Sequence, residues 1–148
     1  MWFEQAKMER PLFALLVHDR RQSLESSNLA LKHISVETFS VRTCEDLQRL
    51  VPQTQPHLIF TDTFLPDGTW VDVINLAEKA AAPINVIVVG TNPDVRLCLS
   101  VLERGAFDFI LPPFEPAGLN SVVRSAGYDA CHRRQAMALA AVSDGTLA

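Results

Sequence analysis

The sequence predicts an α/β domain built on a doubly wound, five-stranded parallel sheet. Short apolar runs alternate with amphipathic stretches, and the pattern repeats five times at intervals of about 20 to 25 residues. The apolar runs have the length that buried parallel strands have. With 148 residues, 48% of them hydrophobic, the chain is long and apolar enough to build one such core.

The five expected strands differ in hydrophobic pattern. Residues 12–17 and 84–89 form continuous apolar runs, typical of strands buried on both faces, and 84–89 is the most hydrophobic and therefore expected to be central. Residues 35–41 alternate with period two, which indicates a more exposed strand near an edge. The other two strands are expected at 57–61 and 107–111.

Helices are expected between these strands, and the first three lie before residue 82. A polar stretch from residue 19 to 34 precedes the second strand. Thr43 can cap a helix that runs to about residue 50, where Pro52 and Pro56 are expected to close it. A further helix is predicted over 70–81, after a turn-rich loop at 63–68.

The last two helices carry clear end signals. Asn92 is expected to cap one of them, with Pro93 at its first position and Gly105 at its C-terminal end. The final helix is expected to begin at Glu115 and to reach His132 or beyond.

Composition excludes several classes of function. A net charge of −4 argues against direct binding of nucleic acid by this domain. No apolar run is long enough to span a membrane, and the first residues do not resemble a secretory signal, so a cytoplasmic location is expected. Three widely spaced cysteines without a CxxC pair, and four histidines that do not cluster with them at zinc-ligand spacing, indicate free thiols rather than a zinc site.

Polar and turn residues follow four of the expected strands. In a parallel α/β sheet, ligands and chemistry gather at the carboxyl ends of the strands. The residues at these ends are His18 and Asp19, then Asp62, then Gly90 and Thr91, and finally Pro112 and Pro113.

Two segments carry a resemblance to a known family. Residues 58–68 read LIFTDTFLPDG and residues 105–114 read GAFDFILPPF. In their residues and in their position along the chain, these segments resemble receiver domains of two-component response regulators. The resemblance covers residues 11–128. The resemblance implies a flavodoxin-like (βα)5 fold. Residues 1–10 would then form a leader, and 129–148 a helix extension or the start of a linker.

The resemblance also implies a chemistry, which is Mg²⁺-assisted phosphoryl transfer from a phosphohistidine to an aspartate. Asp62 stands at the phosphoacceptor position, and Asp19 at the second of two paired acids. Asp19, Asp62 and the backbone carbonyl of Phe64 would be the protein's ligands to the metal. The family is a signalling family, so no enzyme with a catalytic residue of its own is expected here.

Three positions depart from the family's pattern. His18 replaces the first acid and is a poor ligand for Mg²⁺. Gly90 stands where a hydroxyl is needed, with Thr91 one place late. Pro112 replaces the lysine that would hold the phosphoryl group, a loss of about 3 kcal/mol of electrostatic stabilisation. Phe109 keeps the aromatic position.

These departures predict an atypical receiver that signals by protein–protein contact, with no obligatory cofactor and weakened Mg²⁺ binding. Its expected partners are a histidine kinase, an output module or a second copy. The fourth helix, fifth strand and fifth helix would form the contact face, near Leu97, Val101 and Phe109. The alternative is a receiver that a histidine kinase phosphorylates on Asp62.

Simpler interpretations remain open for several residues. Asp62 can be an inherited carboxylate, Asp19 can cap a helix that begins at Arg20, and His18 can satisfy local hydrogen bonds. Pro112 and Pro113 can shape a turn, with a peptide between them that is commonly cis in the family. The pairs Arg20–Arg21 and Arg133–Arg134 are expected at solvated helix ends.

Two other classes fit the sequence less well. A haloacid-dehalogenase phosphatase needs a second aspartate two residues after the nucleophile, but Phe64 stands there and Asp67 comes too late. A flavodoxin-like cofactor binder needs a phosphate-binding loop rich in Ser, Thr and Gly after the first strand, and this sequence has none.

Overall fold

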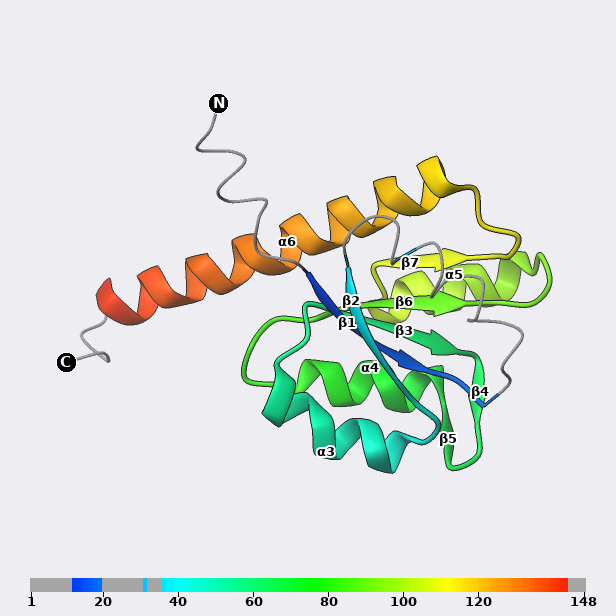
Figure 1. Cartoon of the computed structure of the whole chain (residues 1–148), viewed down its shortest axis with the longest axis horizontal. Coiled ribbons are helices and arrows are strands. Elements are labelled where there is room, and N and C mark those ends of the chain that lie inside the picture. Colours follow the sequence, from blue (N-terminus) through cyan, green and yellow to red (C-terminus); the bar gives the residue numbers. More distant parts are fainter. Residues whose placement is uncertain (1–11, 20–30, 32–35, 144–148) are drawn as a thin grey trace.

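A computed structural model describes residues 12–19, residue 31 and residues 36–143. The expected leader at 1–10, most of the expected first helix, the pair Arg20–Arg21 and the last five residues lie outside this part of the chain. The described strands form a five-stranded parallel sheet, as predicted (Figure 1). The strands are β1 (Phe13–Val17), β2 (Glu37–Val41), β3 (Leu58–Asp62), β6 (Asn85–Val89) and β7 (Asp108–Ile110).

The strand order across the sheet is β2-β1-β3-β6-β7. The prediction that the alternating strand lies at an edge is confirmed, because β2 pairs with β1 alone. The strand predicted to be central, β6, is an inner strand that lies between β3 and β7, and β3 takes the middle place. Both strands are buried along their whole length, so hydrophobicity alone could not rank them.

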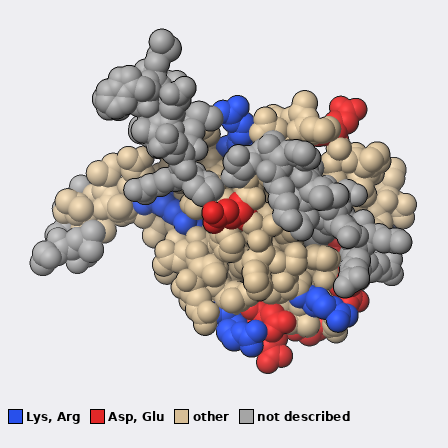
Figure 2. Space-filling model, viewed as in Figure 1, with Lys and Arg blue, Asp and Glu red and all other residues tan. Residues whose placement is uncertain are grey.

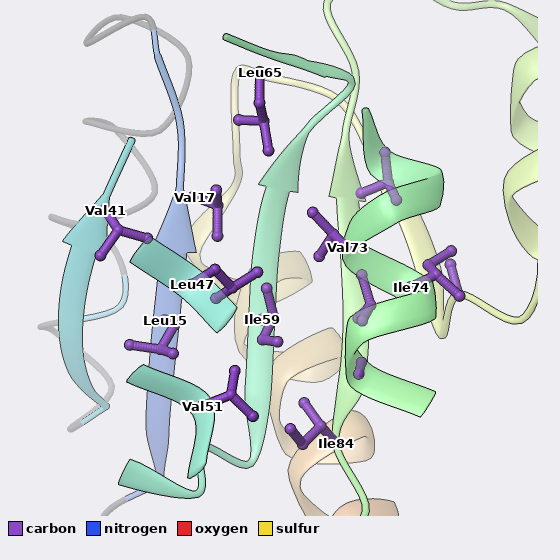
Figure 3. Close-up of a cluster of buried hydrophobic side chains, with 14 of the residues drawn as sticks. Leu15, Val17, Val41, Leu47, Val51, Ile59, Leu65, Val73, Ile74 and Ile84 are labelled. Atoms are coloured by element: carbon purple, nitrogen blue, oxygen red, sulfur yellow. The ribbon is translucent and has the colours of Figure 1, made fainter. Parts of the chain in front are cut away.

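Side chains of the inner strands point alternately to two separate cores, as the period of a strand requires. On one face, Leu15, Ile59 and Val88 pack under α3 (Cys44–Thr54), α4 (Trp70–Glu78) and α5 (Val95–Arg104). Figure 3 shows this cluster, with Leu47 of α3 and Val73 of α4 over the strands. On the other face, residues such as Leu16 and Phe60 pack under α6 (Pro116–Ser143).

Helix α3 begins where the sequence predicted and ends later. The Thr43 hydroxyl accepts a hydrogen bond from the Asp46 amide (3.1 Å), so the predicted cap is confirmed. The expectation that Pro52 closes the helix is wrong, because Pro52 lies inside it. The helix runs one turn further because the Gln55 amide still donates to the Val51 carbonyl (2.9 Å). Gln55, at φ 46°, then ends it.

Two other helix boundaries differ from the prediction. Helix α4 ends at Glu78 rather than at residue 81. Helix α5 is capped by Asp94, whose carboxylate accepts from the Leu97 amide (3.0 Å), and not by Asn92. Two residues in the loop can cap a helix, and the one that meets an amide is decided by the path of the loop. Gly105 ends α5 at φ 116°, as predicted.

The loop that was expected at 63–68 contains a short antiparallel hairpin of β4 (Phe64–Leu65) and β5 (Gly68–Thr69). Helix α6 runs past His132 to Ser143, and its C-terminal turns project beyond the sheet (Figure 1). Across the described residues, none of the helices combines the length and apolar character needed to cross a membrane.

Candidate functional site

The residues that the sequence analysis named at the strand ends come together at the carboxyl-terminal end of the sheet. The last paired residues of β1 and β3 are Val17 and Thr61, so His18 and Asp62 follow side by side. Asp62 pairs with Val89, the residue before Gly90. The register of a parallel sheet thus brings residues from distant parts of the chain to the same place.

Asp62, the expected phosphoacceptor, is the last residue of β3 and is only 8% exposed. The fully buried Thr61 lies beside it and donates its hydroxyl hydrogen to the Asp62 carbonyl oxygen (2.9 Å). Asp62 therefore carries a carboxylate that is largely removed from solvent, at the carboxyl-terminal end of the sheet.

His18 and Asp19 are tied to the end of β2 and to the residue after it. The His18 amide donates to the Val41 carbonyl (3.0 Å). The Arg42 guanidinium donates to the Asp19 carboxylate across 2.8 Å, and both side chains are exposed. An exposed pair of this kind contributes little stability, but it directs one Asp19 oxygen toward Arg42.

These residues form an incomplete version of the Mg²⁺ site that the resemblance implies. Within the described ranges, no three acidic, histidine or cysteine side chains come together in a way that could hold a metal. The first expected acid is a histidine, and one oxygen of the second acid, Asp19, is paired with Arg42. Mg²⁺ can be held by one or two carboxylates with water completing its shell, so Asp62 and Asp19 are the carboxylates left for it, and Arg42 competes with the ion for Asp19.

Gly90 and Phe109 are packed against each other so closely that a side chain at position 90 would require the ring of Phe109 to move. A Cβ atom built on Gly90 would lie 2.4 Å from Cζ of Phe109 and 2.9 Å from Cδ2 of Leu111. The backbone is fixed there as well, because the Gly90 amide donates to the Ile110 carbonyl (2.9 Å). The place where the resemblance expects a hydroxyl side chain is thus occupied by an aromatic ring.

The remaining expected site residues follow the strands at the same carboxyl-terminal end of the sheet. Thr91 is exposed, and Phe64 of β4 is 76% exposed. The peptide bond between Pro112 and Pro113 is cis.

Asp67, which the sequence analysis did not single out as a site residue, links the β4–β5 hairpin to α3. Its carboxylate accepts hydrogen bonds from the amides of Cys44 (2.8 Å) and Glu45 (3.0 Å) at the start of the helix. The bond from the Cys44 amide is the main reason that the pKa of Asp67 is lowered. Burial, followed by the charges of Asp67 and Asp72, raises the pKa of the Cys44 thiol to about 11.

At the amino-terminal end of the sheet, two arginines of α6 donate hydrogen bonds to residues at or before the starts of β3 and β6. The Arg134 guanidinium donates to the backbone carbonyls of Gln55 (3.1 Å), Pro56 and Pro83 (2.9 Å). Arg133 donates to the Asn85 side-chain oxygen (2.6 Å) and to Asp129 (2.9 Å). The expectation that this pair lies at a helix end is wrong, because α6 continues to Ser143, whereas Arg133 is exposed as expected. Sequence could not reveal the contacts of Arg134, because its acceptors are backbone carbonyls far away in the chain.

The chain is similar to proteins of a known family. The family model "Response regulator receiver domain" matches residues 14–124, most of the chain. The chain is 26% identical over 113 residues to the response regulator protein PilR of Pseudomonas aeruginosa, covering 76% of this chain and 25% of that protein. It is 30% identical over 112 residues to the transcriptional regulator NtrC of Azospirillum brasilense, covering 76% and 23%.

Solved structures agree on the fold. NtrX from Brucella abortus superposes with a TM-score of 0.74 at 22% identity, covering 87% of this chain and 29% of that one. The beryllofluoride-activated NtrC4 receiver domain dimer gives a TM-score of 0.71 at 20% identity, covering 79% and 97%.

The chain belongs to the response regulator receiver domain family of two-component signalling. Its fold is the flavodoxin-like α/β fold that the sequence predicted. The chain spans about a quarter of the length of the curated relatives named above.

Proposed function

We propose that this chain is an atypical receiver that signals by protein–protein contact. In it, packing against Gly90, rather than phosphorylation, would fix the place of the Phe109 ring. The observation that carries the proposal is the contact between Gly90 and Phe109. The ring already occupies the space beside the backbone of residue 90, so no hydroxyl group is needed to hold it there.

The surroundings of Asp62 support the same proposal. A transferred phosphoryl group carries charge that the protein must stabilise with a cation, a metal ion or oriented donors. Pro112 stands where the family has its lysine. His18 stands at the first of the paired acids, and the second, Asp19, is ion-paired with Arg42. Phosphorylation of Asp62 would therefore be slow, and no hydroxyl side chain at position 90 would couple it to a movement of Phe109.

The contact face is proposed to include α5, β7 and α6, and it would take a histidine kinase, an output module or a second copy. The α5 helix presents Val95 (74% exposed), Leu99 (54%) and Leu102 (42%) at helical spacing. These residues correct the expectation from sequence, because Val101 is fully buried and Leu97 packs against the core. The domain would act in the cytoplasm and without catalysis of its own.

The test is exposure of the chain to beryllofluoride, or to acetyl phosphate, in the presence of Mg²⁺. Intact mass would report a phosphoryl adduct, and amide NMR shifts would report a change at β6, β7 and α5. We expect no stable adduct and no shifts beyond those of Asp62→Asn. An adduct that is absent in Asp62→Asn, together with shifts at Phe109, would contradict the proposal and establish the phosphorylatable receiver instead.

A further inference from the structure

A groove lies between the C-terminal ends of α3 and α4, at the amino-terminal end of the sheet. Its volume is about 260 Å³, and two of the residues that line it, Val51 and Ile84, are buried members of the core that Figure 3 shows. Its other apolar lining is partly or largely exposed and includes Pro52, Leu76 and Ala81. Because residues 80–82 are all alanines, no long side chain from this loop fills the space. The groove is an apolar hollow without a cover among the described residues.

The size and lining of the groove suit one large aromatic side chain. Small-molecule sites commonly have volumes of roughly 300–1,000 Å³, so this groove is small for a ligand of that class. An indole ring would cover the exposed apolar walls, and the burial of such surface is favourable. The indole N–H also needs an acceptor, and the side-chain amides of Gln48 and Gln55, which line the groove, can supply one. The lining therefore favours a tryptophan.

Charge restricts what can approach this groove. On the face that Figure 2 shows, charged side chains gather along the lower rim of the body, over α3, and the surface to their left is uncharged. The groove itself has one cationic lining residue, Lys79, which follows α4. Lys79 is exposed and takes part in none of the ion pairs between described residues. An occupant with an acidic residue near its aromatic ring would therefore complement the groove.

The leader, residues 1–10, carries this combination. It reads MWFEQAKMER, with Trp2 and Phe3 followed directly by Glu4. Trp2 is one of two tryptophans in the chain, and the other, Trp70, packs against the core. The leader therefore supplies an indole ring and a carboxylate two residues apart.

The leader joins the body beside the groove. At the start of β1, the Phe13 carbonyl accepts a hydrogen bond from the His57 amide (2.9 Å), and Gln55 of the groove lies two residues before His57. The ten residues from Trp2 to Pro11 can span up to about 33 Å, roughly the diameter of a small domain. A segment tethered so close meets the groove at an effective concentration on the order of millimolar. This favours the leader of the same chain over a segment of another molecule.

We propose that Trp2 of the leader docks in this groove of its own chain, with Glu4 beside Lys79. The contact closes the hollow between α3 and α4 with a segment of the chain itself, so this face is not offered to other proteins. The α5 surface remains open for partners. The docking depends neither on phosphorylation of Asp62 nor on the packing of Phe109.

The first test follows the fluorescence of Trp2 in the full chain. Trp70→Phe leaves Trp2 as the only tryptophan. Docking should shift its emission to shorter wavelength and slow its quenching by acrylamide, relative to the same protein in urea. Ala81→Glu places a carboxylate in the groove, near Glu4, and should abolish both effects. Ala140→Glu is the matched control and should leave both unchanged, since Ala140 is also an exposed alanine but lies near the end of α6.

The second test locates the ring. Trp2→Ala should change the amide NMR shifts of groove residues such as Leu76 and Ile84, because an aromatic ring shifts the resonances of nearby atoms. Gln5→Ala, in the same leader, should leave these resonances in place.

Three results would overturn the proposal: quenching of Trp2 as fast as in urea, an equal effect of Ala140→Glu, or shifts from Trp2→Ala that fall outside the groove. Protection of Trp2 that disappears on dilution would overturn it too, because the leader of a second copy would then fill the groove. None of these outcomes bears on the Asp62 experiment, so the proposed function is tested separately.

Discussion

The ring of Phe109 lies where any side chain at position 90 would have to be, with its Cζ atom 2.4 Å from the place of a Cβ on Gly90. This single contact joins the ends of two neighbouring strands, β6 and β7. Gly90 stands where the resemblance expects a hydroxyl side chain. The proposed atypical character of this receiver would therefore have a steric basis as well as a chemical one.

Adding one methyl group at this contact should be costly. Gly90→Ala forces the Phe109 ring or the strand to move, so we expect the free energy of unfolding to fall by about 1–3 kcal/mol. Gly118→Ala is the matched control, because its Cβ meets nothing within 4 Å and α6 should gain up to about 1 kcal/mol. Urea unfolding followed by tryptophan fluorescence measures both. In Phe109→Ala the cost of Gly90→Ala should largely disappear, and an unchanged cost would contradict the steric explanation.

Arg134 should stabilise the fold more than an ordinary surface arginine does. Arg134→Met keeps the apolar stem but leaves the carbonyls of Gln55, Pro56 and Pro83 without their donor. We expect a loss of about 1.5–3 kcal/mol, as for hydrogen bonds to charged groups. Arg96→Met, at an exposed position of α5, should change stability by less than about 0.5 kcal/mol. Equal effects of the two substitutions in urea unfolding would argue against this role.

His57 should make stability depend on pH. Its Nδ1 accepts a hydrogen bond from the Phe13 amide (3.1 Å), and burial, followed by the charge of Arg134, lowers its pKa below 6.5. As the pH falls, His57 is therefore protonated in the unfolded chain before it is protonated in the fold. Its contribution leaves stability unaffected well above pH 6.5, and stability falls as the pH drops below 6.5 toward the pKa of His57 in the fold.

The variant His57→Asn keeps an acceptor for the Phe13 amide but does not titrate. Its free energy of unfolding, measured by urea denaturation between about pH 5 and 8, should show a smaller decline on the acid side. Parallel profiles for the two proteins would mean that His57 does not contribute to the acid sensitivity.

Mg²⁺ should have little effect on the natural chain. We expect no change in melting temperature on adding the ion, because His18 and the pair of Asp19 with Arg42 leave too few free carboxylate oxygens. The double variant His18→Asp with Arg42→Ala supplies a second acid and releases Asp19. At about ten times its dissociation constant, the ion should stabilise this variant by about 1.4 kcal/mol. His18→Asn with Arg42→Ala is the control, and a response of the natural chain equal to that of the double variant would contradict this account.

Much of the architecture could be predicted from residue patterns. The strands, the edge position of β2, the cap at Thr43 and the end of α5 at Gly105 depend on local periodicity and backbone preference. The errors arose where two local signals compete. Pro52 interrupts one hydrogen bond but does not end α3, and Asp94 rather than Asn92 meets the first amides of α5.

By itself, the sequence determined the family, the fold class and the position of Asp62, because these follow from short motifs and from the order of apolar runs. Only the tertiary structure decided that Phe109 fills the space over Gly90 and that Arg134 holds the α6 helix to the sheet. The physical reason is that each of these depends on contacts between residues far apart in the chain. Such contacts are fixed by the register of the strands and by packing, which no local pattern records.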